Sequence, residues 1–210
     1  SALLEQAQAD ALGFGPARWW CPRCALFALA PEPGARCEKC ERPIWPRDYL
    51  TAWDAARSVD WMVGITADVT ETPAQIVAFH RFQKLPWPKA GALIEERAAA
   101  YPGRNRLDST GAGDVLHGYL SIGIEPVLFS GKSKVELVDS LTLALESGEI
   151  KGPSEGAYPY PVTEANDIRH LWAELADYRW DDEALTQDTV MALAMLTHGM
   201  RTARVVGGVA

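Results

Sequence analysis

Residues 108–114 of the chain read DSTGAGD, and this short stretch decides the fold prediction. Residues 104–108 are expected to form a short β-strand, and a helix is expected over residues 115–120. Glycine permits the sharp turn that joins two such elements. The stretch therefore predicts a strand, a turn and a helix, with an acid at each end of the turn. Either Asp108 binds a metal at the strand end, or Asp114 is a catalytic base beside a phosphate-binding glycine loop.

The rest of the pattern predicts an α/β fold. Strands are expected over residues 47–56, 61–69, 75–82, 104–108 and 124–129, and helices over residues 89–100, 115–120, 132–147 and 186–198. Residues 165–175 are expected to be partly strand, with Trp172 and Leu175 inward. Ser130 or Ser133 and Thr186 are the expected helix N-caps. An antiparallel meander followed by βα units gives a mixed sheet with helices on both faces, which is the ribonuclease H-like layout. Other mixed α/β folds fit this pattern nearly as well.

Three acids fall at the ends of these elements. Asp54 lies near the end of the first strand of the meander, where propensity disfavours it, Asp108 ends the fourth strand, and Asp188 lies in the first turn of the last helix. If the first and fourth strands are adjacent, Asp54 and Asp108 lie side by side, and the helix can bring Asp188 over them. Carboxylates this close repel unless cations neutralise them. We therefore expect a catalytic site with two Mg²⁺ or Mn²⁺ ions.

Each acid also has a structural explanation. Asp188 is favourable at the positive end of a helix dipole, Asp108 is a common turn residue, and Asp54 could be paired with Arg57. The joint placement of the three acids favours the metal site over these separate explanations.

All four cysteines lie in one segment, as two CxxC turns twelve residues apart; they are Cys21, Cys24, Cys37 and Cys40. Paired turns of this kind supply the four thiolates of a tetrahedral zinc site. Two disulfides are the alternative, but nothing in the sequence points to secretion. We therefore expect residues 17–46 to be a zinc ribbon around one structural Zn²⁺.

Charge is distributed unevenly along the 210 residues, whose net charge is −8. Residues 17–47 hold six Arg or Lys and three Glu, or +3, which leaves −11 for the rest. An acidic body is a poor surface for nucleic acid unless divalent ions supply positive charge. No apolar run is long enough to cross a membrane, and residues 1–10 do not resemble a signal peptide, so a protein that is not secreted is expected. The first residue is not Met, which indicates a piece of a longer protein.

Three segments together resemble the nuclease domain of the large terminase subunit of tailed phages. They are AWDAARSVDWMVG at residues 52–64, RNRLDSTGAGDVL at residues 104–116 and QDTVMALAM at residues 187–195. In that family a strand Asp, here Asp54, is followed six residues later by a second Asp and then an aromatic residue. Asp60 and Trp61 match these two positions. A second Asp often stands where this chain has Gln187. Whether Asp181 or Asp182 replaces it as a fourth carboxylate is open.

The resemblance covers roughly residues 47–200 and implies a ribonuclease H-like nuclease with a two-metal mechanism. Its catalytic residues and metal ligands would be Asp54, Asp108 and Asp188, with Asp60 and Asp114 as candidate supporting acids. It implies cutting of concatemeric viral double-stranded DNA during genome packaging, in the host cytoplasm, with an ATPase domain, a small terminase subunit and a portal as partners. No GxxxxGK[ST] motif occurs, so the nuclease half of a longer protein, without motor activity, is expected. The expected domains are an N-terminal segment (residues 1–16), the ribbon (17–46), the nuclease (47–200) and a tail (201–210).

Three alternatives remain. Ribokinase-like sugar kinases have a string very similar to DSTGAGD, in which the last Asp, here Asp114, is the base; that interpretation leaves Asp54 unexplained. A resolvase- or transposase-type nuclease would share the acids and differ in substrate. A DNA-binding module without catalysis could be built around the ribbon. Six basic residues could contact a DNA backbone, although a solvated surface charge is the simpler explanation for any one of them: Arg104, Arg106, Lys132, Lys134, Arg201 and Arg204.

Overall fold

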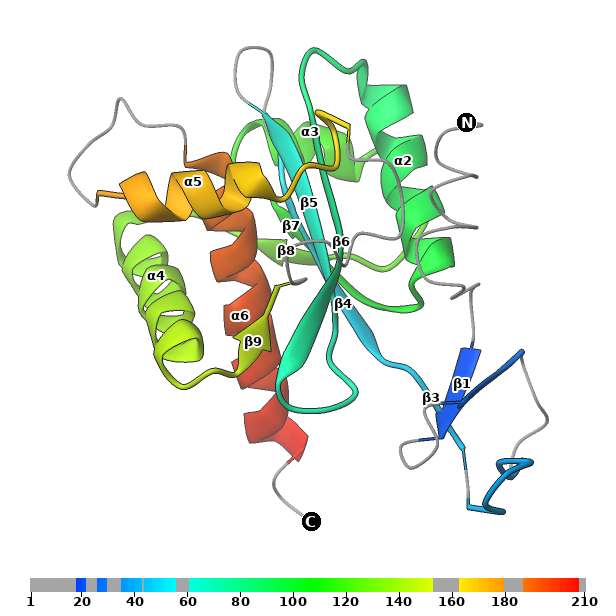
Figure 1. The fold of residues 1–210 in the computed structure, drawn as a ribbon. Helices are drawn as coiled ribbons and strands as arrows, with labels where there is room; N and C mark the ends of the chain where they lie inside the picture. The colour runs from blue at the N-terminus through cyan, green and yellow to red at the C-terminus, as the bar shows by residue number, and fades with distance from the viewer. Residues whose placement is uncertain are drawn as a thin grey trace.

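A computed structural model describes residues 18–21, 26–29, 35–42, 44–55, 61–152, 163–179 and 187–207. Along the chain the elements are β1 (Arg18–Cys21), β2 (Leu26–Leu29), β3 (Trp45–Pro46), β4 (Tyr49–Asp54), β5 (Met62–Asp68), β6 (Ala74–Phe82), α2 (Trp87–Ala100), β7 (Gly103–Asp108), α3 (Ala112–His117), β8 (Glu125–Val127), α4 (Gly131–Glu146), β9 (Ile150–Lys151), α5 (Arg169–Asp177) and α6 (Asp188–Gly207). Figure 1 shows a central sheet with helices on both sides and a small separate sheet of β1, β2 and β3. None of the helices in these ranges has both the length and the apolar character needed to cross a membrane.

The central sheet has six strands in the order β8-β7-β4-β5-β6-β9. β4, β5 and β6 form the antiparallel meander that the sequence predicts. β7 lies parallel to β4, β8 lies parallel to β7, and β9 lies parallel to β6 at the other edge. The mixed sheet is therefore confirmed, and β4 and β7 are direct neighbours.

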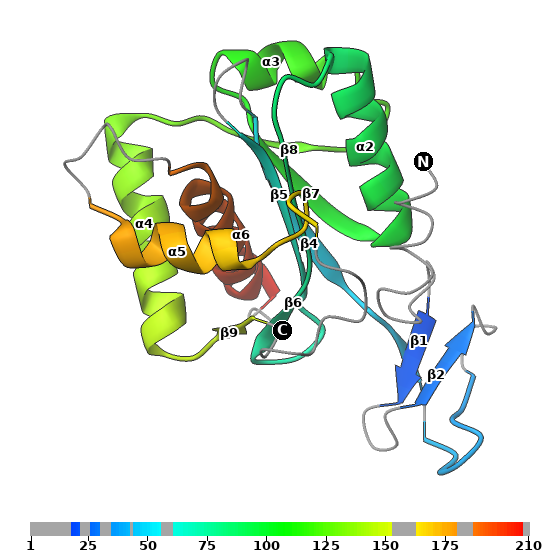
Figure 2. The same ribbon diagram turned by 45° about the horizontal axis from the view of Figure 1, so that its top comes forward.

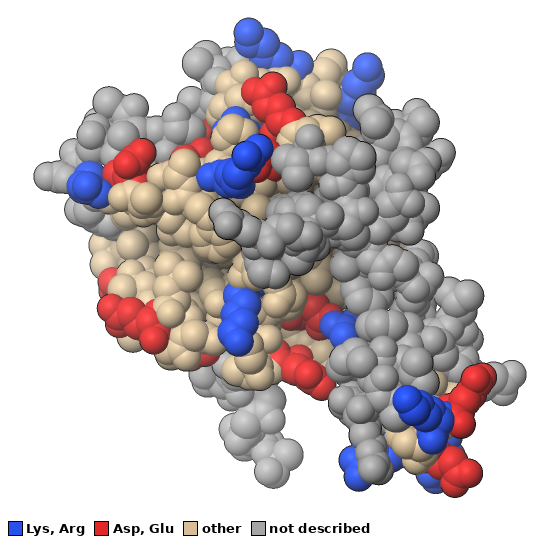
Figure 3. Space-filling view, in the orientation of Figure 1, with Lys and Arg blue, Asp and Glu red and all other residues tan. Residues whose placement is uncertain are grey.

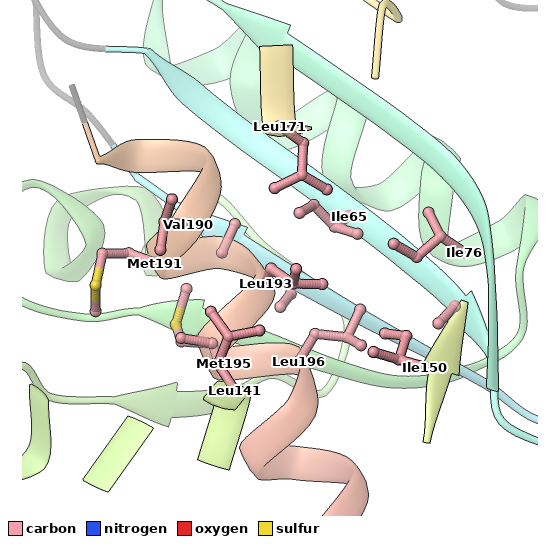
Figure 4. Close-up of a cluster of buried hydrophobic side chains, with 14 of the residues drawn as sticks. Ile65, Ile76, Leu141, Ile150, Leu171, Val190, Met191, Leu193, Met195 and Leu196 are labelled. Atoms are coloured by element: carbon pink, nitrogen blue, oxygen red, sulfur yellow. The ribbon is translucent and has the colours of Figure 1, made fainter. Parts of the chain in front are cut away.

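Helices cover both faces of the sheet, as Figures 1 and 2 show. On one face α6 packs along β4 and β5, and α4 and α5 pack against α6. Figure 4 shows Leu193 and Leu196 of α6 in one buried cluster with Ile65 and Ile76 of the sheet. On the other face, α2 and α3 form a second core with apolar residues of β4 and β7. Every residue of β4 and β5 is buried because both faces of these strands are covered.

The last helix runs antiparallel to β4 and β7. Arg104, at the beginning of β7, donates a hydrogen bond to the carbonyl of Gly199, late in α6, at 3.1 Å. Asp188, at the beginning of α6, accepts a hydrogen bond from the backbone of Trp61, which precedes β5 opposite the end of β4. The amino end of α6 therefore lies at the carboxyl ends of β4 and β7.

The prediction of a partial strand over residues 165–175 is wrong, because α5 lies there. Leu171 is fully buried and Leu175 is half-buried, and residues four apart share one face of a helix. Trp172, predicted to point inward, is 36% exposed because the helical period turns it away from that face. Leu175 does pack against the core, as expected.

Two helices also differ from prediction at their ends. α3 covers Ala112–His117, where a helix over residues 115–120 was expected. α6 continues beyond the expected end at residue 198 to Gly207, so it enters the segment predicted as a tail. Continued burial at Met200 shows why the helix is favourable there. Its predicted N-cap, Thr186, lies outside the described residues. The cap of α4 is confirmed, because Ser130 and Ser133 each accept a hydrogen bond from the other's backbone N–H.

Candidate functional site

The turn after β7 folds back over the end of its own strand. The Thr110 N–H donates to Asp108 Oδ1 at 2.8 Å. Gly113 lies so close to Asp108 that a Cβ at position 113 would be 1.5 Å from the Asp108 carbonyl oxygen. Gly111 has a φ of 60°, which residues with a side chain rarely adopt. The two glycines thus have separate roles: Gly111 makes the turn, and Gly113 permits the close backbone approach.

Asp54 and Asp108 end neighbouring parallel strands. β4 and β7 pair as far as Trp53 and Leu107, so the two acids occupy the next matched position, where adjacent strands lie about 4.8 Å apart. Trp53 and Leu107 pack with α2 and α3, and strand side chains alternate, so both acids project to the face covered by α6. They are 8% and 6% exposed. The adjacency on which the metal-site prediction depends is present.

Asp188 reaches the same edge of the sheet from α6. Its Oδ2 accepts a hydrogen bond from the Trp61 N–H at 2.9 Å, and Val63, two residues further on, pairs with Asp54. The three predicted acids therefore lie at one edge and on one face. Their assignment as catalytic residues and as Mg²⁺ or Mn²⁺ ligands stays a prediction.

The electrostatics of this edge suit a divalent cation. Burial raises the pKa of Asp108, and hydrogen bonds from Thr110 oppose that effect without cancelling it. A nearby positive charge would stabilise the ionised form. Within the described residues no group of three or more His, Cys, Asp or Glu side chains is arranged to hold a metal ion. Because Mg²⁺ is commonly held by one or two carboxylates together with water, the Asp54–Asp108 pair fits it, with Asp188 alongside.

A second set of polar contacts, which no local sequence pattern indicates, surrounds the amino end of α6. The Arg81 guanidinium lies 4.0 Å from the centre of the Trp61 ring, 2.9 Å from His170 Nε2 and 3.8 Å from the Glu174 carboxylate. Glu174 in turn accepts a hydrogen bond from the Thr189 N–H at 3.0 Å. His170 and Glu174 are four residues apart on α5, a spacing that becomes informative only once a helix is recognised there. Because a partial strand was predicted over these residues, the shared helical face of His170 and Glu174 was missed.

The basic residues proposed for DNA contacts have different surroundings. Arg106 is buried, donates to the Met195 carbonyl of α6 and pairs with Glu125, so its prediction as a DNA contact is wrong. Lys132 is exposed, and Lys134 donates to Gln187 Oε1 at 3.0 Å.

Arg104 and Arg201 form ion pairs with Glu125 and Glu149. The side chain of Arg204 is not described. DNA contacts by these residues stay predictions.

None of the remaining candidate acids is placed by the described residues at the proposed metal site. Asp114 is exposed in the first turn of the six-residue helix α3. Asp60, Asp181 and Asp182 lie outside the described residues, so neither a fourth carboxylate nor a supporting role for Asp60 is tested.

Two cysteines lie in a compact described turn. The Glu41 N–H donates to the Cys37 carbonyl, and the Cys37 N–H donates to the Arg42 carbonyl, both at 2.8 Å. Glu41 has a positive φ of 58°, and Cys37 and Cys40 share a small core with Ile44. Such a turn can present two thiolates to one ion.

The other CxxC motif begins in the sequence at the end of β1 and precedes β2, and these two strands pair antiparallel. Cys21 ends β1, but its side chain is not described, and Cys24 lies outside the described residues. The zinc ribbon therefore stays a prediction.

Comparison with known proteins gives a result at the level of structure. No protein-family model and no curated protein matches the sequence. The large terminase nuclease from thermophilic phage G20c, solved with bound magnesium, is 18% identical over 90% of this chain and 95% of that chain, with a TM-score of 0.59. A second structure of that nuclease is 20% identical over 71% of this chain and 81% of that chain, with a TM-score of 0.57. The Mn-soaked human cytomegalovirus terminase nuclease domain is 13% identical over 72% of this chain and 83% of that chain, with a TM-score of 0.53.

These likenesses establish the fold. The chain has the ribonuclease H-like α/β fold of large terminase nuclease domains, as its motifs predict.

Proposed function

We propose that this chain is a metal-dependent DNA endonuclease, the nuclease domain of a large terminase subunit. The observation that supports this most directly is the placement of Asp54 and Asp108 at matched ends of adjacent parallel strands. Asp188 approaches on the same face from the amino end of α6. Three acids from distant parts of the sequence thus lie toward one edge of a fold shared with terminase nucleases.

In this proposal the chain's own residues fix the positions of the catalytic carboxylates. Strand pairing sets the separation of Asp54 and Asp108, the Thr110 N–H orients the carboxylate of Asp108, and the Trp61 N–H orients that of Asp188. Two Mg²⁺ or Mn²⁺ ions bound by these acids would lower the pKa of an attacking water and neutralise charge on the phosphodiester. Burial of Asp54 and Asp108 excludes bulk water and strengthens these electrostatic effects.

The proposed substrate is concatemeric viral double-stranded DNA, cut during genome packaging. In that setting an ATPase domain, a small terminase subunit and a portal are the partners, and the host cytoplasm is the location. Among the described residues on the face seen in Figure 3, basic and acidic side chains are interspersed and do not form one continuous basic surface. With a net charge of −8, the chain would depend on bound cations for part of its attraction to DNA.

Residues 17–46 are proposed to bind one structural Zn²⁺ through Cys21, Cys24, Cys37 and Cys40. The turn at Cys37 and Cys40 supports this, as does the hairpin of β1 and β2, which spans the other CxxC pair. Four thiolates would leave no open coordination position, so the ion would have a structural role.

The sugar-kinase alternative has less support. It requires backbone amides of the glycine turn to face a phosphate, whereas Gly113 packs against the Asp108 carbonyl. Asp114, the base in that alternative, is exposed on a short helix. The alternative also gives no role to the buried acids at the sheet edge.

A plasmid-cleavage assay tests the proposal. With Mn²⁺ or Mg²⁺ the chain should nick or linearise supercoiled plasmid with little sequence preference, and EDTA should stop the reaction. Asp108→Ala should abolish cleavage because it removes a metal ligand, whereas Asp114→Ala, in the same turn, should retain most of it. A parallel assay with ATP and a panel of sugars should show no phosphoryl transfer.

Metal-dependent cleavage by the Asp108→Ala protein at the wild-type rate would contradict the assignment. ATP-dependent sugar phosphorylation that is lost in Asp114→Ala would support the kinase instead. A strong preference for branched junctions over linear duplex would favour the resolvase-type alternative.

A further inference from the structure

A carboxylate from α5 caps the first turn of α6. Glu174 accepts the backbone N–H of Thr189 at 3.0 Å, and its Oε2 also accepts the Thr189 hydroxyl. Thr189 is fully buried, and the first backbone N–H groups of a helix have no acceptor within the helix. A carboxylate at this position satisfies one such N–H and is favoured by the helix dipole. Glu174 therefore anchors the residue that directly follows Asp188.

Glu174 is held in turn by Arg81, on the sheet. The two charged groups are 3.8 Å apart, and both side chains are close to nine-tenths buried. Arg81 also contacts His170, one turn before Glu174 on α5, at 2.9 Å. The α5 helix thus meets the sheet through an ion pair and a hydrogen bond that end on the same guanidinium.

The contacts continue from Arg81 back to Asp188. The Arg81 guanidinium lies over the Trp61 ring, 4.0 Å from its centre. The N–H of that same Trp61 donates to Asp188 Oδ2 at 2.9 Å. These contacts form a closed loop that begins and ends at Asp188. Thr189, the next residue in the chain, is hydrogen-bonded to Glu174, and Glu174 forms an ion pair with Arg81. Arg81 lies over the ring of Trp61, whose N–H donates to the Asp188 carboxylate.

We propose that Glu174 and Arg81 are positioning residues that fix Asp188 at the metal-binding edge. Glu174 holds the backbone of Asp188 through Thr189, and Arg81 holds its carboxylate through Trp61. Metal ligands must be held to within about 0.5 Å, and side chains that support them commonly change metal affinity by about 10- to 100-fold. The proposal rests on the proposed function in one respect, namely that Asp188 takes part in metal binding.

The test compares four variants of the full chain with wild type. Glu174→Ala removes the acceptor and the charge, whereas Glu174→Gln keeps an acceptor oxygen for Thr189 and loses only the charge. Asp177→Asn is the matched control, because it removes an exposed carboxylate from the same helix. Asp188→Ala shows how much metal binding depends on Asp188 itself.

Three readouts are needed. The first is the backbone amide signal of Trp61 in ¹⁵N-tryptophan-labelled protein without metal, assigned by its loss in Trp61→Phe. The second is Mn²⁺ binding, followed by the electron paramagnetic resonance of free Mn²⁺. The third is the plasmid-nicking rate as a function of Mn²⁺ concentration.

We expect Glu174→Ala to shift the Trp61 amide signal and to raise the half-saturating Mn²⁺ concentration about 10-fold. Glu174→Gln should lie between Glu174→Ala and wild type, and Asp177→Asn should match wild type in all three readouts. If Glu174→Ala does not fold, the same three readouts are compared between Glu174→Gln and wild type. Wild-type Mn²⁺ binding and an unchanged Trp61 signal in the folded Glu174 variants would overturn the proposal.

The outcomes separate this inference from the proposed function. If wild type binds Mn²⁺ through Asp188 but cuts no DNA, the nuclease proposal fails, while the Trp61 signal and Mn²⁺ binding still support the positioning roles. If wild type cuts DNA and Asp188→Ala binds Mn²⁺ and cuts as wild type does, the positioning proposal fails and the nuclease stands.

Discussion

Replacing Gly113 by Ala is the sharpest test of how the turn supports Asp108. The added Cβ would lie 1.5 Å from the Asp108 carbonyl oxygen and 2.6 Å from its carbonyl carbon. Ordinary contact begins near 3.4 Å, so the backbone of the turn and the strand end must separate by about 2 Å. Both atoms in the way belong to backbone, so no side-chain rotation can relieve the overlap.

The displacement would act directly on the proposed metal site. A misplacement of about 1 Å can cost a catalytic site about 100-fold in rate, so we expect Gly113→Ala to lose at least about 100-fold in plasmid nicking at saturating Mn²⁺. Overpacking of this kind also costs about 1–3 kcal/mol in the free energy of unfolding. The loss of activity should exceed what partial unfolding explains at a temperature where the variant is folded.

Gly111→Ala is the matched control in the same turn. Position 111 has a φ of 60° but no atom within 4 Å of an added Cβ. The variant should lose about 1–3 kcal/mol to backbone strain and yet retain most of its nicking activity, because nothing pushes Asp108. Urea unfolding curves and nicking rates for both variants separate a loss of stability from a displacement of Asp108. If Gly113→Ala nicks as fast as Gly111→Ala, the packing of Gly113 does not position Asp108.

Three further predictions concern stability and metal content. Since burial raises the pKa of Asp108 above the ordinary 3.8, ionisation lowers stability as pH rises from that value through the folded pKa. In the absence of divalent metal ions, Asp108→Asn should therefore be more stable than wild type in urea unfolding at neutral pH, by about 1 kcal/mol, with the difference shrinking toward acid; an equal difference at all pH values would contradict this. Arg106→Met should cost about 1–3 kcal/mol in urea unfolding, chiefly because the buried Met195 carbonyl loses a donor, while the half-exposed Glu125 can be hydrated and DNA affinity changes little. Metal analysis should find about one Zn²⁺ per chain, and Cys37→Ser should lose it; oxidised cysteines without zinc would refute the ribbon.

The candidate site could be predicted where its residues belong to a local sequence pattern. Asp54 and Asp108 stand out because each interrupts or ends an apolar strand, and DSTGAGD shows where the chain must turn. The meander of β4, β5 and β6 follows from three strands in succession with short connections. Each of these signals is contained within about ten residues.

The predictions that failed depend on partners distant in sequence. The helix α5 was not predicted because its apolar stripe is short. That stripe is recognisable as the buried face of a helix only when it packs against the core beside α6. Arg106 resembles a surface cation in the sequence, yet it is buried because α6 and Glu125 supply its acceptors.

The sequence by itself determined the end of β7 at Asp108, the acids of the candidate site and the glycines that let the chain leave β7. Only the tertiary structure decided which acids become neighbours and which contacts hold them. Asp54 and Asp108 become neighbours through parallel pairing of β4 and β7, which are separated by two strands and a helix along the chain. The packing of α6 places Asp188 toward the same edge, and Glu174 and Arg81 are added by contacts over 15 or more residues. Such contacts depend on complementary burial and charge across the whole fold, and no local pattern encodes them.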